Sequence, residues 1–155
     1  MKINLGFAKM EDLPAIKNLF EASIRQTCQA DYSAAEIEAW LQTLQNKDRW
    51  EELIKQQVVW LAMADTQLAG FCSLKAGDYL DFMYVSPHHQ GMGLAKLLLK
   101  AAVLEARKQG KDTLSSDISI TARPFFDSQG WKVIRKNENP RGDQVLINYR
   151  MEFRL

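Results

Sequence analysis

A predicted strand, a turn with two glycines and a long helix follow one another over residues 79–110, and this segment carries the clearest chemical signal in the chain. Gly91 and Gly93 have no Cβ atom, so backbone N–H groups can converge on a ligand at this turn without steric obstruction. The helix that begins near Gly91 adds unpaired N–H donors and about half a positive charge at its N-terminus. The segment therefore suits a phosphate or pyrophosphate group.

Two familiar phosphate-binding motifs do not fit this segment. A P-loop requires Gly-Lys followed by Ser or Thr, and the segment has no such triplet. The dinucleotide-binding fingerprint requires a third glycine at the position that Lys96 occupies. Taken alone, one Gly-x-Gly pair is more typical of an ordinary loop than of a binding site.

The segment lies within an alternation of strands and helices that predicts one α/β domain with a mixed sheet. Period-two apolar patterns and turn signals predict strands at residues 3–7, 58–64, 68–74, 79–85, 113–116, 131–134 and 145–153. Helical spacing predicts helices after Asp12, from the capping box Ser33–Glu36, near Gly91 and around Phe126, with a short helical piece at Trp50. The predicted order is β-α-α-β-β-β-α-β-α-β-β, with a turn at residues 139–142.

Length and composition restrict the class of protein. The 155 residues fit a single domain spanning residues 1–155, with 46% hydrophobic and 25% charged residues. Twenty Lys and Arg against 19 Asp and Glu argue against a nucleic-acid partner, which usually requires a basic excess. No apolar run approaches the ~20 residues that span a bilayer. We therefore expect a cytoplasmic protein with no membrane segment.

The cysteines and histidines do not predict a metal site. Cys28 and Cys72 are far apart and lie among apolar neighbours, which predicts buried free thiols rather than a zinc set or a disulfide framework. Neither has a local histidine that would activate it as a nucleophile. His88 and His89 lack a third ligand, so we expect no metal.

The wider pattern around the glycines resembles a known family. Val85 and Pro87, followed by Gln90-Gly91-Met92-Gly93-Leu94-Ala95, resemble the acetyl-CoA-binding motif of the GNAT superfamily of N-acetyltransferases. Downstream, Ser119-Ile120-Thr121-Ala122-Arg123-Pro124-Phe125-Phe126 and Gly130-Trp131 resemble its second motif, Asn-x-x-Ala-x-x-x-Tyr followed by Gly and an aromatic residue. The closing Asn148-Tyr149-Arg150-Met151 is similar to a subgroup of small bacterial members. With the order of elements, the resemblance covers nearly the whole chain.

The resemblance implies a centrally splayed sheet and acetyl-CoA as the acetyl donor. It assigns the pyrophosphate to backbone N–H groups of the loop, namely Gln90, Gly91, Met92, Gly93, Leu94 and Ala95. The pantetheine arm is expected along Met83, Tyr84 and Val85, with the N–H of Tyr84 or a neighbour polarising the thioester carbonyl. Ser119 and Phe126 fall at cofactor-side positions of the second motif. Lys96 is either a phosphate contact or a solvated lysine of the helix.

Direct acetyl transfer needs a neutral amine, and deprotonating a lysine-like amine of pKa ~10.4 near neutral pH costs roughly 4 kcal/mol. A positioned carboxylate can assist. We predict that Asp81 is this base, since alternation along its strand would place it on the same face as Met83 and Val85. The alternative is that Asp81 is an edge-strand carboxylate that only favours solubility. Asp117, just before the Ser119 helix, is the second candidate for the base; alternatively, it caps this helix or complements the helix dipole in the first turn.

The general acid departs from the family pattern. Many members use a tyrosine at the position of Phe126, and Ser119 replaces a frequent asparagine. Tyr149 and Tyr84 are possible substitutes, although packed strand aromatics are commoner. Because a thiolate of pKa near ~8.5 leaves without much help, weak or solvent-assisted acid catalysis is expected.

The acceptor side is expected between Gln26 and Trp50, where Tyr32, Trp40 and Trp50 are candidates to line the pocket. The sequence thus predicts an acetyl-CoA-dependent N-acetyltransferase that acts on a primary amine, of a small molecule or peptide, through a ternary complex. Homodimers are common among similar proteins, so a homodimer is a further prediction. The alternative function is an acyl-CoA-binding sensor or interaction module with little turnover, which the missing tyrosine at Phe126 favours.

Overall fold

One seven-stranded sheet runs through the whole chain. The computed structural model describes residues 1–155, and its strands lie in the order β1-β2-β3-β4-β5-β7-β6. All neighbouring strands are antiparallel except β4 and β5, which are parallel. The strands are β1 (Ile3–Phe7), β2 (Val58–Ala64), β3 (Gln67–Lys75), β4 (Tyr79–Val85), β5 (Thr113–Ser119), β6 (Lys132–Arg141) and β7 (Gln144–Arg154).

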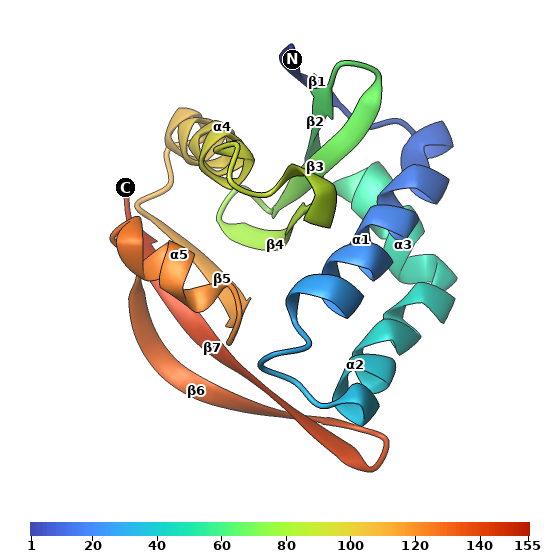
Figure 1. The fold of residues 1–155 in the computed structure, drawn as a ribbon. Helices are drawn as coiled ribbons and strands as arrows, with labels where there is room; N and C mark the ends of the chain where they lie inside the picture. The colour runs from blue at the N-terminus through green and yellow to red at the C-terminus, as the bar shows by residue number, and fades with distance from the viewer.

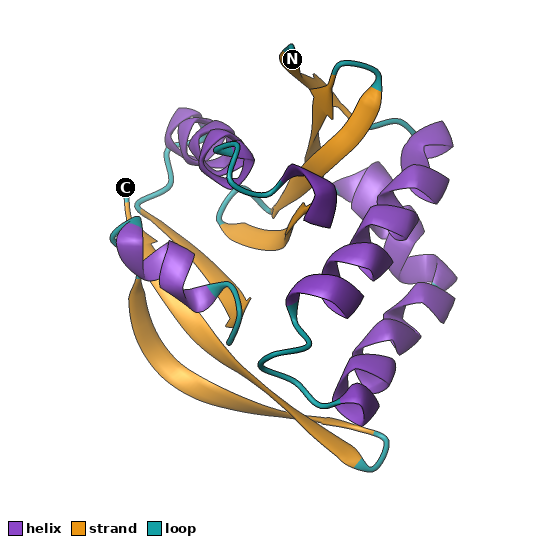
Figure 2. Ribbon diagram, viewed as in Figure 1, coloured by secondary structure: helices purple, strands orange, loops and turns teal.

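Helices cover both faces of the sheet (Figure 1 and Figure 2). Helices α4 and α5 pack on one face, and α1, α2 and α3 pack on the other. The helices are α1 (Leu13–Thr27), α2 (Ala34–Leu41), α3 (Lys47–Gln56), α4 (Leu94–Lys108) and α5 (Arg123–Ser128), with short 3-10 turns η1 (Met10–Asp12), η2 (Gln42–Gln45) and η3 (Pro87–His89). None of the helices has both the length and the apolar character needed to cross a bilayer.

The α/β architecture is confirmed, although several elements differ from the prediction. Strand β5 extends to Ser119 and β6 to Arg141, whereas the predicted strands end at residues 116 and 134. The capping box at the start of α2 forms as expected, since Ser33 Oγ accepts the Glu36 N–H at 3.1 Å and the Glu36 carboxylate accepts the Ser33 N–H at 2.8 Å. The short helical piece at Trp50 is a complete third helix, α3. The predicted turn at residues 139–142 is wrong, because β6 continues through Pro140, as an edge strand tolerates, and turns at Gly142.

Strands β4 and β5 separate almost as soon as they meet. Their only paired residues are Tyr79 and Ser115, and the Ser116 hydroxyl adds a hydrogen bond to the carbonyl of Leu80 at 2.6 Å. Beyond this point the two strands diverge, as Figure 1 shows. The predicted central splay is therefore confirmed.

A β-bulge interrupts the alternation of side chains in β4. The register passes from the pair Ser73–Phe82 to the pair Leu74–Leu80 and leaves Asp81 without an opposite residue. A bulge sets two successive residues against one partner, so it changes the face to which the extra side chain points. Period-two alternation therefore fails at Asp81.

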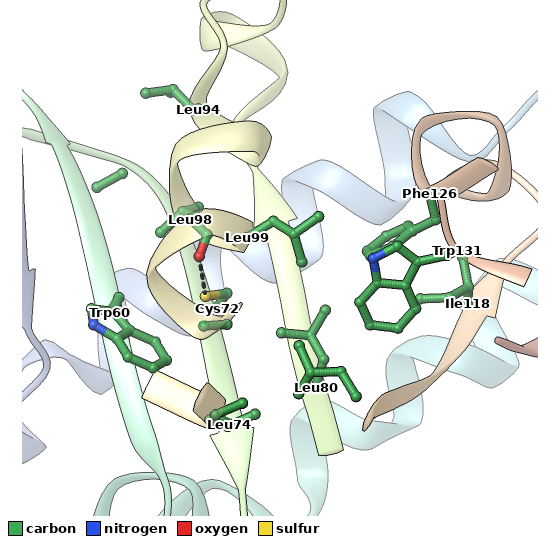
Figure 3. Packing of buried hydrophobic residues seen from close by; sticks show 14 of the residues in the cluster. Trp60, Cys72, Leu74, Leu80, Leu94, Leu98, Leu99, Ile118, Phe126 and Trp131 are labelled. Atoms are coloured by element: carbon green, nitrogen blue, oxygen red, sulfur yellow. Dashed lines mark hydrogen bonds between the residues drawn. The ribbon is translucent and has the colours of Figure 1, made fainter. Parts of the chain in front are cut away.

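Two buried clusters lie on the two faces of the sheet. The cluster beneath α4 and α5 appears in Figure 3, where the Cys72 thiol donates a hydrogen bond to the carbonyl of Leu98 at 3.5 Å. The cluster beneath α1, α2 and α3 is built around Phe20 and Trp50, whose rings meet edge to face with centroids 5.1 Å apart. Cys28 and Cys72 are both buried free thiols, as predicted. Each cluster thus fills one face of the sheet, and the cluster beneath α4 and α5 includes residues from both sides of the splay, such as Leu80 and Leu114.

Candidate active site

A cavity of about 200 Å³ lies where β4 and β5 separate. Residues from β4, the glycine loop, the end of β5 and α5 line one part of it, and residues from α1 and α2 line the other. The fourteen lining residues are Ser23, Thr27, Cys28, Trp40, Met83, Tyr84, Val85, Gln90, Ala95, Ser119, Thr121, Ala122, Phe125 and Phe126. None of them is charged. The cavity brings many of the predicted cofactor residues together with one predicted acceptor residue, Trp40.

The backbone of β4 turns alternate N–H groups toward this cavity. The Ser86 N–H donates to the carbonyl of Ala69 at 2.7 Å and the Phe82 N–H donates to Ser73 Oγ at 3.1 Å, so both point toward β3. Since successive N–H groups of a strand point in opposite directions, those of residues 83 and 85 face the splay. The N–H of residue 84 lies on the β3 side, so the N–H groups of residues 83 and 85 are better placed than it is to donate to a thioester carbonyl in the cavity.

The loop before α4 has the backbone that an anion site requires. Gly91 and Gly93 both have a φ of +75°, and a Cβ added to either would meet nothing within 4 Å. Their N–H groups lie beside the open N-terminus of the fifteen-residue helix α4. Ala95 lines the cavity, whereas Lys96 borders a separate hollow of about 290 Å³ between α4 and the end of β7.

The histidines beside this loop differ from one another. His88 is exposed, but His89 is buried, with a ring Nδ1 atom that has no hydrogen-bond partner. No group of three or more His, Cys, Asp or Glu side chains is arranged to hold a metal ion.

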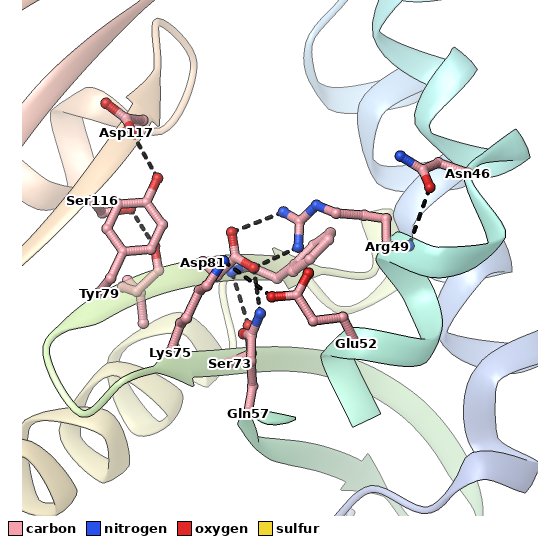
Figure 4. Close-up of polar contacts among 12 residues, drawn as sticks. Asn46, Arg49, Glu52, Gln57, Ser73, Lys75, Tyr79, Asp81, Ser116 and Asp117 are labelled. Carbon is pink, nitrogen blue, oxygen red and sulfur yellow. Dashed lines mark hydrogen bonds and ion pairs between the residues drawn. The ribbon is translucent and has the colours of Figure 1, made fainter. Parts of the chain in front are cut away.

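The carboxylate of Asp81 is held in an ion pair on the α3 side of the sheet (Figure 4). Arg49 of α3 donates to Oδ2 at 2.6 Å and to Oδ1 at 2.8 Å, and Gln57 donates to Oδ2 at 2.6 Å. Burial alone would lower the pKa of Arg49, but Asp81 raises it. Met83 and Val85 pack in the opposite cluster, so the predicted shared face is wrong. The Asp81 side chain is only 8% exposed, and these donors occupy it.

Asp117 lies within β5 rather than ahead of a helix, so its predicted capping role is wrong. Arg150 on β7 donates to both carboxylate oxygens at 2.9 Å, the Tyr79 hydroxyl donates at 2.6 Å and Asn137 donates at 2.8 Å. Burial acts to raise the pKa of Asp117, but these hydrogen bonds outweigh burial and lower it. A carboxylate in this setting is a weak proton acceptor.

The two tyrosines considered as general acids occupy different environments. Tyr149 packs under Arg123, whose guanidinium carbon lies 4.6 Å from the ring centroid, and it does not line the cavity. Tyr84 does line the cavity, and burial raises its pKa. Of the two, only Tyr84 borders the cavity.

The second predicted motif supports the wall of the cavity. Ser119 Oγ accepts the Ala122 N–H at 3.0 Å and so fixes the turn that leads into α5. Phe126 is buried with its ring centroid 5.0 Å from that of Trp131. Phe126 therefore offers an apolar wall where a tyrosine would offer a hydroxyl.

The three predicted acceptor aromatics are not brought together. Trp40 lines the cavity and contacts Tyr32, with ring centroids 5.3 Å apart. Tyr32 itself is buried; its hydroxyl donates to the carbonyl of Ile147 at 2.6 Å and accepts the Ile120 N–H at 3.0 Å. Burial raises the pKa of Tyr32 to about 12. Trp50 borders a larger hollow of about 570 Å³ between α1 and α3, away from the splay.

The family model described as the acetyltransferase (GNAT) domain matches residues 28–153. The chain belongs to the GNAT acetyltransferase family. This GNAT chain is 28% identical over 143 residues to YafP, an uncharacterised N-acetyltransferase of Escherichia coli, and the match covers 92% of this chain and 90% of YafP. The family resemblance and the type of enzyme, a GNAT-type acetyltransferase, are thereby confirmed.

Solved structures show the same GNAT architecture. A GCN5-related N-acetyltransferase from Rhodopseudomonas palustris superposes with a TM-score of 0.95 at 28% identity, covering 100% of this chain and 97% of that one. PaiA N-acetyltransferase from Thermoplasma acidophilum, solved in complex with coenzyme A, gives 0.81 at 24% identity over 100% of both chains. The latter likeness is one of fold.

Several residues of the GNAT cavity were missed from the sequence. Ser23 and Thr27 lie four residues apart on α1, among the buried Phe20 and Ile24, and this polar interruption of an apolar helix face was a usable signal. Cys28 and Thr121 gave no such signal, because only the fold brings the end of α1 to the β5–α5 connection.

Proposed function

We propose that this GNAT chain transfers an acetyl group from acetyl-CoA to a primary amine by direct attack in a ternary complex. The cavity at the splay carries the proposal. It is lined by β4 and the glycine loop on the side suited to a cofactor, and by α1 and α2 on the side open to a second substrate.

On the donor side, the free N–H groups of Met83 and Val85 suit an extended pantetheine arm, which would lie beside β4 in place of the missing strand neighbour. The loop N–H groups and the N-terminus of α4 suit the pyrophosphate. The coenzyme A bound by PaiA, which shares the fold, supports acetyl-CoA as the donor. A contact from Lys96 to the phosphates stays a prediction.

In the transfer step, the amine nitrogen attacks the thioester carbonyl, whose oxygen is stabilised by the N–H of Met83 or Val85. The C–N bond forms, the C–S bond breaks and CoA leaves as a thiolate that takes up a proton. Burial raises the pKa of Cys28, which keeps this thiol protonated and favours direct transfer over an acetyl-enzyme. Tyr84 is the only tyrosine among the cavity's lining residues, so it is our candidate to assist the thiolate.

The second candidate is a sensor that binds acyl-CoA with little turnover. The apolar Phe126 and the arginine-paired Asp81 and Asp117 favour it. Release of free CoA thiol in the presence of amines separates the two functions, because only the enzyme consumes acetyl-CoA. The homodimer and the cytoplasmic location stay predictions.

The donor site is tested by calorimetric titration of acetyl-CoA into the native protein and two matched variants. Gly91→Glu should abolish binding, since the side chain adds bulk and negative charge at the phosphate loop. Gly110→Glu is the control, because Gly110 has a φ of +74° and equally open surroundings about 22 Å away at the other end of α4. Micromolar binding lost only in Gly91→Glu supports the proposal, and no binding to the native protein refutes it.

A further inference from the structure

The acceptor amine must lose a proton before it attacks, yet none of the cavity's lining residues is Asp, Glu, His, Lys or Arg. At pH 7 only about 1 in 2,500 lysine-like amines of pKa ~10.4 is neutral. A carboxylate at the entrance that attracts the ammonium group and receives its proton would increase the supply of neutral amine at the thioester.

The two strand carboxylates do not fill this role. Asp81 and Asp117 each accept two hydrogen bonds from an arginine and at least one more from a neutral side chain. Either one would have to give up a bidentate ion pair to bind a proton.

Asp31, in the segment between α1 and α2, is differently placed. Its Oδ2 accepts a hydrogen bond from Thr121 Oγ1 at 2.8 Å, and its N–H donates to the carbonyl of Cys28 at 3.0 Å. Thr121 and Cys28 both line the cavity, where the β5–α5 connection that holds Thr121 meets the end of α1 that holds Cys28. Asp31 is exposed and forms no ion pair, so its carboxylate is free to meet a cation and to pass a proton to water.

Hydrogen bonds of the neighbouring Tyr32 hold the segment that carries Asp31 in place. Its hydroxyl joins the carbonyl of Ile147 to the N–H of Ile120, and Ile120 precedes the threonine that Asp31 contacts. The titratable groups beside Asp31 are Cys28 and Tyr32, and burial raises the pKa of both, so neither competes for the proton between pH 6 and 8. Because these hydrogen bonds of Tyr32 fix the backbone next to Asp31, the carboxylate is positioned before the substrate binds.

We propose that Asp31, acting through Thr121, draws a protonated primary amine to the cavity and receives its proton; this rests on the proposed function. The ammonium gives a proton to Thr121 Oγ1 as that hydroxyl passes its own proton to Asp31, which releases it to solvent. The neutral amine then forms the C–N bond as the C–S bond breaks. The second amine proton leaves with the CoA thiolate, which gives N-alkylacetamide and CoA thiol.

The test measures CoA thiol release at saturating acetyl-CoA between pH 6 and 9. The acceptor probes are alanine methylamide, with a free α-amine, and Nα-acetyl-lysine methylamide, with a free side-chain amine. Asp31→Asn should raise the amine KM at pH 7 at least tenfold, and its kcat/KM should keep rising with pH toward the pKa of the amine. The affinity for acetyl-CoA should stay within twofold. The probe whose KM rises more in Asp31→Asn shows whether the acceptor is an α-amine or a lysine side-chain amine.

Three further variants control this result. Asp112→Asn changes another exposed aspartate, between α4 and β5, and should behave as the native enzyme. Thr121→Val removes the hydroxyl link and should reproduce the Asp31→Asn pH profile, whereas Thr121→Ser keeps it and should not. Identical pH profiles for the native enzyme and Asp31→Asn would overturn the role of Asp31. A native enzyme that binds acetyl-CoA but acetylates neither probe would overturn the amine chemistry itself.

Discussion

At the scale of single residues, the aspartates show how chemistry depends on partners that are distant in sequence. Asp81 meets Arg49 from 32 positions away, Asp117 meets Arg150 from 33, and Thr121 meets Asp31 from 90. The residue types of the phosphate loop were readable because its chemistry is local. Which carboxylate is paired and which is free depends on strand register and helix docking, which no local pattern encodes.

The lowered pKa of Asp117 makes a prediction about stability. The native carboxylate binds its proton less tightly than the unfolded chain does, so the stabilisation is present above the unfolded pKa of ~3.9 and is lost as the pH falls through the native value. Asp117→Asn should lower the free energy of unfolding by about 1 to 2 kcal/mol at pH 7. Urea unfolding from pH 7 to pH 3 should show this difference shrinking at the acid end.

The control for this experiment is Asp143→Asn at the exposed β6–β7 turn, whose carboxylate contacts only the neighbouring Gln144. It should stay within about 0.5 kcal/mol of the native protein at every pH. A difference for Asp117→Asn that stays constant down to pH 3 would contradict a stabilising ionised carboxylate.

At the scale of elements, periodicity predicted most strands and helices, and the exceptions have physical causes. The bulge at Asp81 and the extension of β5 to Ser119 depend on pairing with β3 and β7, respectively. The predicted strand ends at Ile134 and the predicted turn contains Pro140, but β6 includes Pro140, because an edge strand tolerates a residue without an N–H group. The α1–α2 connection is placed by Tyr32, whose hydrogen bonds to Ile147 in β7 and to Ile120 just after β5 have no sequence signal.

Tyr32→Phe tests how strongly that connection is tied to the sheet. The substitution keeps the buried ring but leaves the carbonyl of Ile147 and the N–H of Ile120 without their partner. We expect the free energy of unfolding to fall by about 1 to 3 kcal/mol in urea unfolding. Tyr149→Phe is the control, since phenylalanine keeps the ring contact with Arg123, and a loss as small as in this control would show that the hydroxyl is dispensable.

At the scale of the whole molecule, the sheet consists of two halves joined by a single backbone register pair. Strands β1 to β4 form one half and β5 to β7 the other, and the pair Tyr79–Ser115 joins them. A ligand that lies between β4 and β5 would add contacts to both halves. We therefore expect the bound cofactor to stabilise the folded protein in addition to serving as a reactant.

Amide hydrogen exchange followed by NMR checks this arrangement. Without ligand, the N–H groups of Met83 and Val85 should exchange at least tenfold faster than those of Phe82 and Ser86, which are hydrogen-bonded toward β3. Acetyl-CoA should slow the exchange of Met83 and Val85 most. Equal protection of all four groups in the free protein would show that the splayed strand is not open.

The edge strand β6 affects how two copies of the protein can associate. β6 ends the sheet and exposes Ile134, a combination that invites a second chain to add by backbone pairing. Lys132, Arg135, Lys136 and Arg141 lie along the same strand. If two copies paired through β6, these positive charges would lie close together. We therefore expect charge repulsion at this edge strand to disfavour self-association and fibre growth.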